Sequence, residues 1–197
     1  TTIWYSQMNN FLIVGQPRTG TNSVIKMLQN FHGVKDFTIN NKLHGTAKWL
    51  TSKNTVAKMH TEREYKQYKK IIKDVRQKIS CVYFTKTRSS LLEHFISLLC
   101  VSVTRSDEHN VLGKPDYPVS NDVCYGLIAN FISEYKKMEH YIKQYKSYRW
   151  SSRKNIDVFQ GFKYRENKYS KNFTNDYFED VELIRNFINE ELHRNRL

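Results

Sequence analysis

The segment from Gly15 to Ser23, GQPRTGTNS, has the residue types and the spacing of a phosphate-binding loop. Gly15 and Gly20 stand at G-x4-G spacing, after the apolar run FLIVG and before apolar residues at helical spacing. A strand, a glycine-containing turn and a helix direct backbone N–H groups and the helix N-terminus toward a bound anion. Arg18 adds a planar guanidinium that can bind the same anion. The segment therefore predicts a site for a phosphate-like group.

The same loop lacks two groups that nucleotide hydrolases use. Thr21 occupies the position of the Walker lysine, and Asn22 occupies the position of the metal-binding serine or threonine. Without these groups the β and γ phosphates of a nucleotide lose their charge partners. An ATP or GTP hydrolase is therefore disfavoured, and the loop suits a donor that needs no metal ion. An ordinary turn between a strand and a helix is the alternative.

A second group of reactive side chains follows the short strand predicted at residues 55–58. Lys58 and His60 lie at the carboxyl edge of that strand. A histidine there can accept a hydroxyl proton near neutral pH, and a neighbouring lysine can offset negative charge that develops on an oxygen. A pair of surface residues without a catalytic role is the alternative interpretation.

Residues 17–21, PRTGT, resemble the loop of the sulfotransferases that use PAPS (3'-phosphoadenosine 5'-phosphosulfate) as the sulfuryl donor. In that family the loop reads PKSGT or PRSGT and lies between the first strand and the first helix. The resemblance implies that Arg18 contacts the region of the transferring sulfate, and that the glycine and hydroxyl residues hold the 5'-phosphate. The donor-binding residues implied for the loop are Gln16, Pro17, Arg18, Thr19, Gly20, Thr21, Asn22 and Ser23.

The sequence Lys58-Met59-His60 is similar to the K-x-H segment of the cytosolic members of that family. There the lysine stabilises the sulfuryl group and the histidine is the general base. The resemblance implies that Arg18, Lys58 and His60 are the catalytic residues, with PAPS as donor and PAP, its desulfated form, as product. His44 and His94 are the alternative bases.

Residues 82–97 resemble the 3'-phosphate site of the family, which implies that Arg88 and Ser97 bind this phosphate. Eight residues separate the two, whereas the cytosolic pattern has seven, a spacing that Ser89 and Ser97 meet. Two further family features are missing. Ser23 stands where a tryptophan often stacks on adenine, and the C-terminal basic glycine loop is not recognisable. Four basic residues are candidates to replace this loop, and the alternative is that they are ordinary solvated charges: Arg153, Lys154, Lys163 and Arg165.

Alternating strand-like and helix-like segments predict an α/β fold with a central parallel sheet in three layers, and the family resemblance implies a P-loop NTPase-like sulfotransferase architecture. We predict one domain over residues 1–197, with a nucleotide-binding part at about 8–103 and an acceptor-binding part at about 104–197. The predicted strands are 11–15, 55–58, 79–84 and 156–160. A helix is predicted after the loop, with Phe31 on its apolar face, and another from a capping box at Thr61 and Glu64, with Tyr65 on its apolar face. Further helices are predicted from about residue 91, over 121–147 and over 176–193. Residues 85–90 are predicted as a turn and 104–120 as an irregular loop.

The composition is that of a globular protein, with 39% hydrophobic residues, 14% aromatic residues and a net charge of +13. Such a charge suggests an anionic partner, although solvated helix faces also explain it. Cys81, Cys100 and Cys124 lie in apolar stretches without metal-ligand spacing, so we expect reduced core residues and no metal site. No run approaches the roughly 18 apolar residues of a membrane span. We therefore expect a cytoplasmic protein.

The family resemblance, together with a loop that suits a metal-free donor, implies an enzyme that transfers a sulfuryl group from PAPS to a hydroxyl or amine of a small-molecule or glycan acceptor without a metal ion. One alternative is a nucleotide or nucleoside kinase-like P-loop protein, which needs Mg²⁺ and a carboxylate to hold it. Another is a noncatalytic module that binds nucleic acid or another polyanion. Nucleic acid is disfavoured because the tyrosines recur at core spacing on helices and not as stacking platforms.

Overall fold

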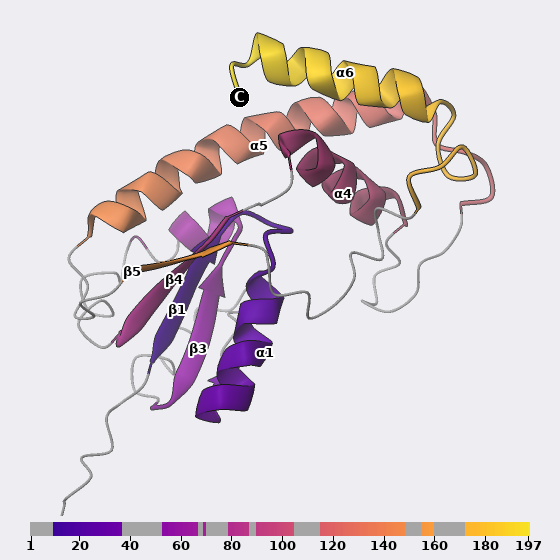
Figure 1. Ribbon diagram of the computed structural model, residues 1–197. Coiled ribbons are helices and arrows are strands. Elements are labelled where there is room, and N and C mark those ends of the chain that lie inside the picture. Colours follow the sequence, from indigo (N-terminus) through magenta and orange to yellow (C-terminus); the bar gives the residue numbers. More distant parts are fainter. Residues whose placement is uncertain are drawn as a thin grey trace, which may run out of the picture. The chain divides into compact units, whose positions relative to one another are not determined.

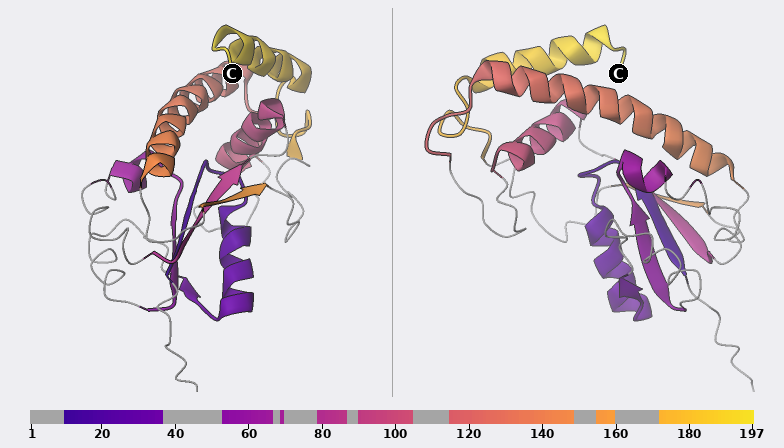
Figure 2. Two further views of the ribbon diagram at one scale, coloured as in Figure 1. Left: turned by 60° about the vertical axis from the view of Figure 1, so that its left-hand side comes forward. Right: turned by 180° about the vertical axis from the view of Figure 1, so that it is seen from behind.

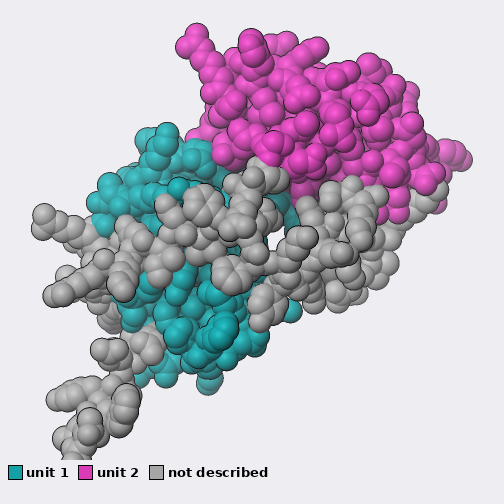
Figure 3. Space-filling view, viewed as in Figure 1, with its two compact units in different colours: residues 1–86, 137–162 teal, residues 87–136, 163–197 magenta. Residues whose placement is uncertain are grey.

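The computed structural model describes residues 10–36, 53–66, 69, 79–86, 90–104, 115–148, 155–159 and 172–197, with residues 155–159 described for the backbone only. The chain divides into two compact units, shown in Figure 3. Unit 1 comprises residues 1–86 and 137–162, and unit 2 comprises residues 87–136 and 163–197. Each unit therefore contains two separate stretches of the chain. The prediction of one functional domain stays a prediction.

Unit 1 contains a parallel sheet, whose described strands run in the order β2-β3-β1-β4-β5. The strands are β1 (Phe11–Gly15), β2 (Lys35–Asp36), β3 (Thr55–Met59), β4 (Cys81–Lys86) and β5 (Asn155–Phe159). All five residues of β1, FLIVG, are buried, because both faces of the sheet are covered. The predicted α/β class with a central parallel sheet is thus confirmed (Figure 1).

Each face of the sheet in unit 1 has its own apolar layer. Helix α1 (Thr21–His32) covers one face, where Ile13 packs with Val24, Ile25 and Leu28. The other face, which includes Leu12, packs against the helical residues 62–66 and against α5 (Asn121–Ser147). The residues that these two helical segments contribute are Tyr65, Met138, Ile142 and Tyr145. The arrangement makes three layers (Figure 2).

Two sequence predictions about unit 1 were wrong in detail. The strand predicted at 79–84 begins at Cys81 and continues to Lys86, so Thr85 belongs to the strand and not to a turn. Phe31, predicted on the apolar face of α1, is 76% exposed because α1 buries residues up to Leu28 only. The capping box is confirmed: the Thr61 hydroxyl accepts from the Glu64 N–H at 3.3 Å, and the Glu64 carboxylate accepts from the Thr61 N–H at 2.9 Å.

The core of unit 2 is helical. Helix α4 (Leu91–Thr104), residues 121–136 of α5 and α6 (Val181–Arg194) bury apolar side chains together. The predicted helix at 121–147 is confirmed, and its apolar stripe lies in the protein core. The closing helix begins at Val181, five residues later than predicted, because Asp180 caps it and buried Phe178 forms a bridge with Val119.

The predicted irregular loop at 104–120 was wrong at its first residue, since Thr104 ends α4; residues 105–114 lie outside the described part of the chain. The three cysteines are free thiols, with Cys100 and Cys124 buried and Cys81 partly buried. Among the described helices, none combines the length and the apolar character needed to cross a bilayer.

Replacing Gly15 with alanine should destabilise the protein strongly, because the new Cβ would lie 1.8 Å from the Thr85 Oγ1. We expect a loss of roughly 3 kcal/mol or more in the free energy of unfolding, the range of severe overpacking. The matched control is Gly126→Ala on α5, where the added Cβ meets no atom within 4 Å among the described residues. Gly126→Ala should stabilise by about 0.5–1 kcal/mol. Denaturant unfolding measures the stability of both variants. Equal stabilities of Gly15→Ala and Gly126→Ala would contradict the close approach of Thr85 to Gly15.

Candidate functional site

The candidate site lies in unit 1, where β1, β3 and β4 end. Because β1 pairs in parallel with both neighbours, the carboxyl ends of the three strands lie side by side. The chain leaves β1 toward α1 on one face and leaves β3 toward helix 62–66 on the other face. Neighbouring strands whose connections leave to opposite faces are the place where open α/β sheets bind ligands.

The loop after β1 has two residues in the left-handed conformation, Arg18 with φ 66° and Gly20 with φ 84°. Glycine adopts this conformation freely, whereas for arginine it costs about 1–2 kcal/mol. Gly20 is the N-cap of α1, and within the described chain no side chain caps this helix. By contrast, Asp180 accepts from two backbone N–H groups at the start of α6. The start of α1 also carries no acidic residue in its first turn, so its positive end suits an anion.

Buried hydroxyl groups hold the loop against β4. The Thr19 hydroxyl donates to the Gln16 carbonyl at 2.6 Å, and its oxygen lies 2.6 Å from the Thr85 Oγ1. Since a hydroxyl has only one proton, Thr85 is the donor to Thr19. The Gln16 side chain donates to Glu139 of α5 at 3.0 Å. These contacts fix the path of the loop from two sides.

The predicted donor-binding side chains of the loop differ in exposure. Gln16, Thr19 and Thr21 are at most 6% exposed, so these side chains shape the loop and do not face outward. The others are Pro17, Arg18, Gly20 and Ser23, which are half-buried, and Asn22, which is exposed. Any ligand contact of the loop therefore comes from the backbone N–H groups and from this second set.

Lys58 brings its ammonium group from β3 to the first turn of α1. Its Nζ donates to the Asn22 Oδ1 at 2.7 Å. Burial lowers the pKa of Lys58 below the usual lysine range, while the negative charges of Glu64 and Asp36 oppose this shift. The loop has no lysine of its own, and Lys58 supplies a cation at the start of the helix from a neighbouring strand.

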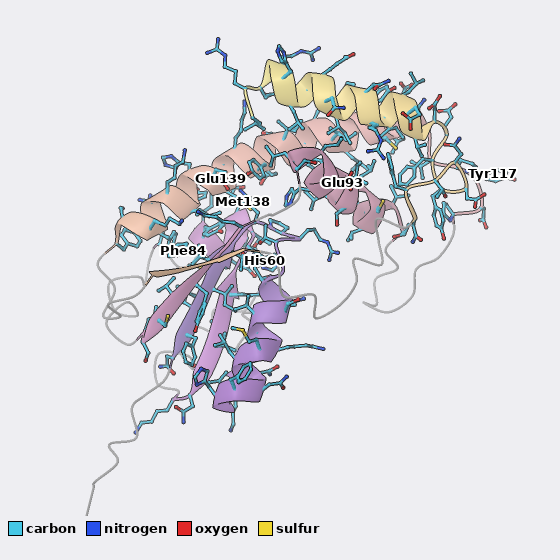
Figure 4. All side chains as sticks on the ribbon, viewed as in Figure 1. His60, Phe84, Glu93, Tyr117, Met138 and Glu139 are labelled. Atoms are coloured by element: carbon cyan, nitrogen blue, oxygen red, sulfur yellow. The ribbon has the colours of Figure 1, made fainter. Side chains whose placement is uncertain are left out.

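His60 follows β3 directly, and 24% of its side chain is exposed. Its Nδ1 lies 3.3 Å from the Glu64 Oε2, in a geometry that makes no hydrogen bond among the described residues. Burial lowers the pKa of His60 below its usual value, with Lys58 acting in the same direction and Glu64 against it. This direction favours the neutral imidazole near pH 7, the form that is able to accept a proton. Figure 4 shows His60 beyond the end of β3 and Glu139 on α5.

Tyr65 ties the ends of β1 and β3 together. Its hydroxyl has a single proton, which it shares between the Gly15 carbonyl oxygen at 2.9 Å and the Met59 carbonyl oxygen at 3.4 Å. The Tyr145 hydroxyl of α5 in turn donates to the Tyr65 carbonyl at 2.9 Å. The two carbonyl groups immediately precede Gln16 of the loop and His60, so Tyr65 fixes the starting points of both.

The remaining predicted residues belong to unit 2 or lie outside the described part of the chain. Ser97 is 3% exposed on α4 of unit 2, and His94 is 2% exposed and packs against the rings of Phe95 and Tyr135. The predicted residues that lie outside the described part are His44, Arg88, Ser89, Arg153, Lys154, Lys163 and Arg165.

Sequence reasoning missed Tyr65, Thr85 and Glu139 as residues that support the site. The role of Thr85 could have been predicted, since a threonine near the end of an apolar strand lies at the same sheet edge as the loop. Tyr65 was predicted only as part of an apolar helix face. Glu139 had no signal, because it lies 123 residues after Gln16 in the chain.

The comparisons with known proteins found no similarity. No family model matches the chain, and neither the curated proteins nor the solved structures contain a match.

Replacing Tyr65 with phenylalanine should destabilise unit 1, because two buried carbonyl groups lose their shared donor. We expect a loss of about 1–3 kcal/mol in the free energy of unfolding. Tyr141→Phe is the control: the Tyr141 ring stacks on Tyr65 at 5.5 Å, and no hydrogen bond of its hydroxyl is found among the described residues. Equal effects of the two substitutions in denaturant unfolding would show that the Tyr65 hydroxyl contributes nothing.

Proposed function

We propose that this chain is a sulfotransferase that moves the sulfuryl group of PAPS to a hydroxyl or amine of a small-molecule or glycan acceptor, without a metal ion. The proposal includes a P-loop NTPase-like architecture for the sheet and its first loop. The observation that carries it is the 2.7 Å contact between the Lys58 Nζ and Asn22 at the start of α1, which no described side chain caps. This contact joins Lys58 of the K-x-H segment to the residue that directly follows PRTGT, and the two segments resemble the family separately.

The arrangement supports binding of a 5'-phosphosulfate better than binding of a triphosphate. The backbone N–H groups at the start of α1 suit one tetrahedral anion, and Arg18 and Lys58 provide two cationic groups. The positions at which a nucleotide hydrolase carries its lysine and its metal-binding hydroxyl hold Thr21 and Asn22. Asn22 instead accepts a hydrogen bond from Lys58, which uses its carbonyl oxygen.

In the proposed reaction the acceptor oxygen attacks the sulfur atom in line with the bond to the 5'-phosphate. The new S–O bond forms as the bond between sulfur and the phosphate oxygen breaks, and PAP leaves. His60 takes the acceptor proton, while Lys58 and Arg18 offset the negative charge on the bridging and sulfuryl oxygens. Catalysis would come from positioning and charge stabilisation, as in phosphoryl transfer.

The distribution of charge along the chain supports an anionic ligand of unit 1. Unit 1 contains 21 Lys and Arg residues against 6 Asp and Glu residues, whereas unit 2 contains 11 against 13. The net charges are thus +15 and −2, so the entire positive excess belongs to the unit that carries the loop. A positive field of this kind raises the local concentration of anionic ligands.

PAP and PAPS should raise the melting temperature in the presence of EDTA, because a ligand that binds only the folded state stabilises it. ATP with Mg²⁺ and single-stranded DNA should give smaller shifts. A thermal-shift series with these four ligands decides between the candidate functions. A larger shift with ATP that EDTA abolishes would favour a kinase, and a DNA shift with steep salt dependence would favour a polyanion-binding module.

Arg18→Gly separates the ligand role of Arg18 from its structural role. Glycine adopts φ 66° without strain, and relief of the backbone cost at Arg18 opposes the losses of its side-chain interactions and of unfolded-state order, so we expect a change of less than about 1 kcal/mol in the free energy of unfolding. Affinity for PAPS should fall by about 1.5–3 kcal/mol, the cost of a lost charged hydrogen bond, and affinity for PAP should fall less. Calorimetric titration measures both affinities. Unchanged PAPS binding would remove Arg18 from the sulfuryl site.

His60→Ala should lower kcat by roughly 10²- to 10⁴-fold, because a general base acts in the transition state. Affinity for PAP should change little. The control is His140→Ala on the exposed side of α5, which should retain both properties. Normal turnover of His60→Ala would show that another group takes the acceptor proton.

The activity of the parent should also depend on pH. Since burial lowers the pKa of His60 below the usual value of about 6.5, the parent should keep full activity at pH 7 and lose it as the pH falls through that lowered pKa. A profile of kcat against pH measures this dependence.

A further inference from the structure

Glu64 lies beside His60 and belongs to the capping box of the helix that begins at residue 62. The residue is 7% exposed. Its Oε2 accepts hydrogen bonds from the backbone N–H groups of His60 at 2.8 Å and Thr61 at 2.9 Å. The same oxygen lies 3.3 Å from the His60 Nδ1. One carboxylate oxygen therefore contacts both the backbone and the ring of the proposed base.

The position of this oxygen decides which ring nitrogen of His60 can act. A carboxylate next to Nδ1 favours the tautomer that carries its proton on Nδ1, which leaves the lone pair on Nε2. The Nδ1 atom is buried while 24% of the side chain is exposed, so Nε2 is the ring nitrogen that we assign to contact with an acceptor. Glu64 itself is held by two backbone N–H groups and is not placed to take the acceptor proton.

We propose that Glu64 is the positioning residue of His60, which keeps Nε2 as the basic nitrogen and stabilises the imidazolium that forms when Nε2 takes the acceptor proton. This inference depends on the proposed sulfuryl transfer. In that step the proton passes from the acceptor hydroxyl to Nε2, and the positive ring then faces the negative Oε2 through its Nδ1–H. Glu64 would act through His60 and would not touch the substrate.

Among the described residues, the charges that face His60 come from two elements. Burial lowers the pKa of His60 most, Glu64 at the start of helix 62–66 raises it, and Lys58 of β3 lowers it. Glu64 also raises the pKa of Lys58, together with Asp36 of β2. Neutralising Glu64 therefore should make His60 a weaker base, although its backbone contacts can persist.

Glu64→Gln tests this role, because the glutamine oxygen can still accept from both backbone N–H groups, as glutamine does in capping boxes. The matched control is Glu62→Gln on the same helix, where the carboxylate pairs with exposed Lys66. Three quantities are measured for parent and variants: the His60 pKa by NMR titration without ligand, the PAP affinity, and kcat as a function of pH.

For Glu64→Gln we expect a lower His60 pKa, an acid limb of kcat that moves to lower pH, and a plateau kcat reduced by roughly tenfold or more. PAP affinity should stay within about twofold, and Glu62→Gln should match the parent. If Glu64→Gln does not fold, Glu64→Asp keeps the charge but withdraws it by one methylene, and it should change the same quantities less.

An unchanged His60 pKa in the variant, or a fall in kcat with an unmoved acid limb, would overturn the role of Glu64. The NMR titration needs no donor, so it is independent of the proposed reaction. A parent that neither binds PAP nor transfers sulfuryl groups overturns the proposed function and the catalytic role together. If the parent does transfer them, an unchanged His60 pKa in Glu64→Gln overturns the role of Glu64 alone.

Discussion

The close approach of the Thr85 hydroxyl to Gly15 is the constraint on which the geometry of the loop depends. Parallel register places Thr85 of β4 opposite Gly15 of β1, and the absence of a side chain at Gly15 leaves room for the hydroxyl. Thr85 can then reach Thr19, whose own proton goes to the Gln16 carbonyl. The loop is thus held by short buried side chains, and no described side chain caps the positive end of α1. Any side chain at Gly15 would displace the Thr85 hydroxyl and so remove its contact with Thr19.

The start of helix 62–66 makes the second half of the site rigid. Two consecutive residues hold the backbone here. Glu64 accepts hydrogen bonds from the N–H groups that follow β3, and Tyr65 shares its hydroxyl proton between carbonyl groups at the ends of β1 and β3. Lys58, His60 and Glu64 are thereby brought together with limited access to water. A buried carboxylate is costly unless its partners are fixed, so the same contacts that hold the backbone also keep the charges in place.

Local patterns in the sequence predicted most of the strands and helices, because each pattern reports a buried face. FLIVG is apolar throughout since both faces of β1 are covered, and the Thr61 and Glu64 capping box was visible at its spacing. Strand and helix ends were less certain: Thr85 extends β4 through pairing with β1, which no local pattern reports. The loop, Lys58 and His60 were predicted at one sheet edge, and their strand ends do lie side by side. The contact of Gln16 with Glu139 joins distant segments, so only the folded chain reveals it.

Charge acts in this protein on two length scales that have different consequences. The excess of +15 in unit 1 is spread over many residues. At physiological salt the Debye length is about 8 Å, so most of these charges affect the rate of encounter with an anion and not its orientation. Orientation requires groups at contact distance, and Lys58 is such a group because Asn22 holds its ammonium at the start of α1. Loss of distant lysines should therefore weaken association with every anion alike, whereas the loop and Lys58 determine which anion fits.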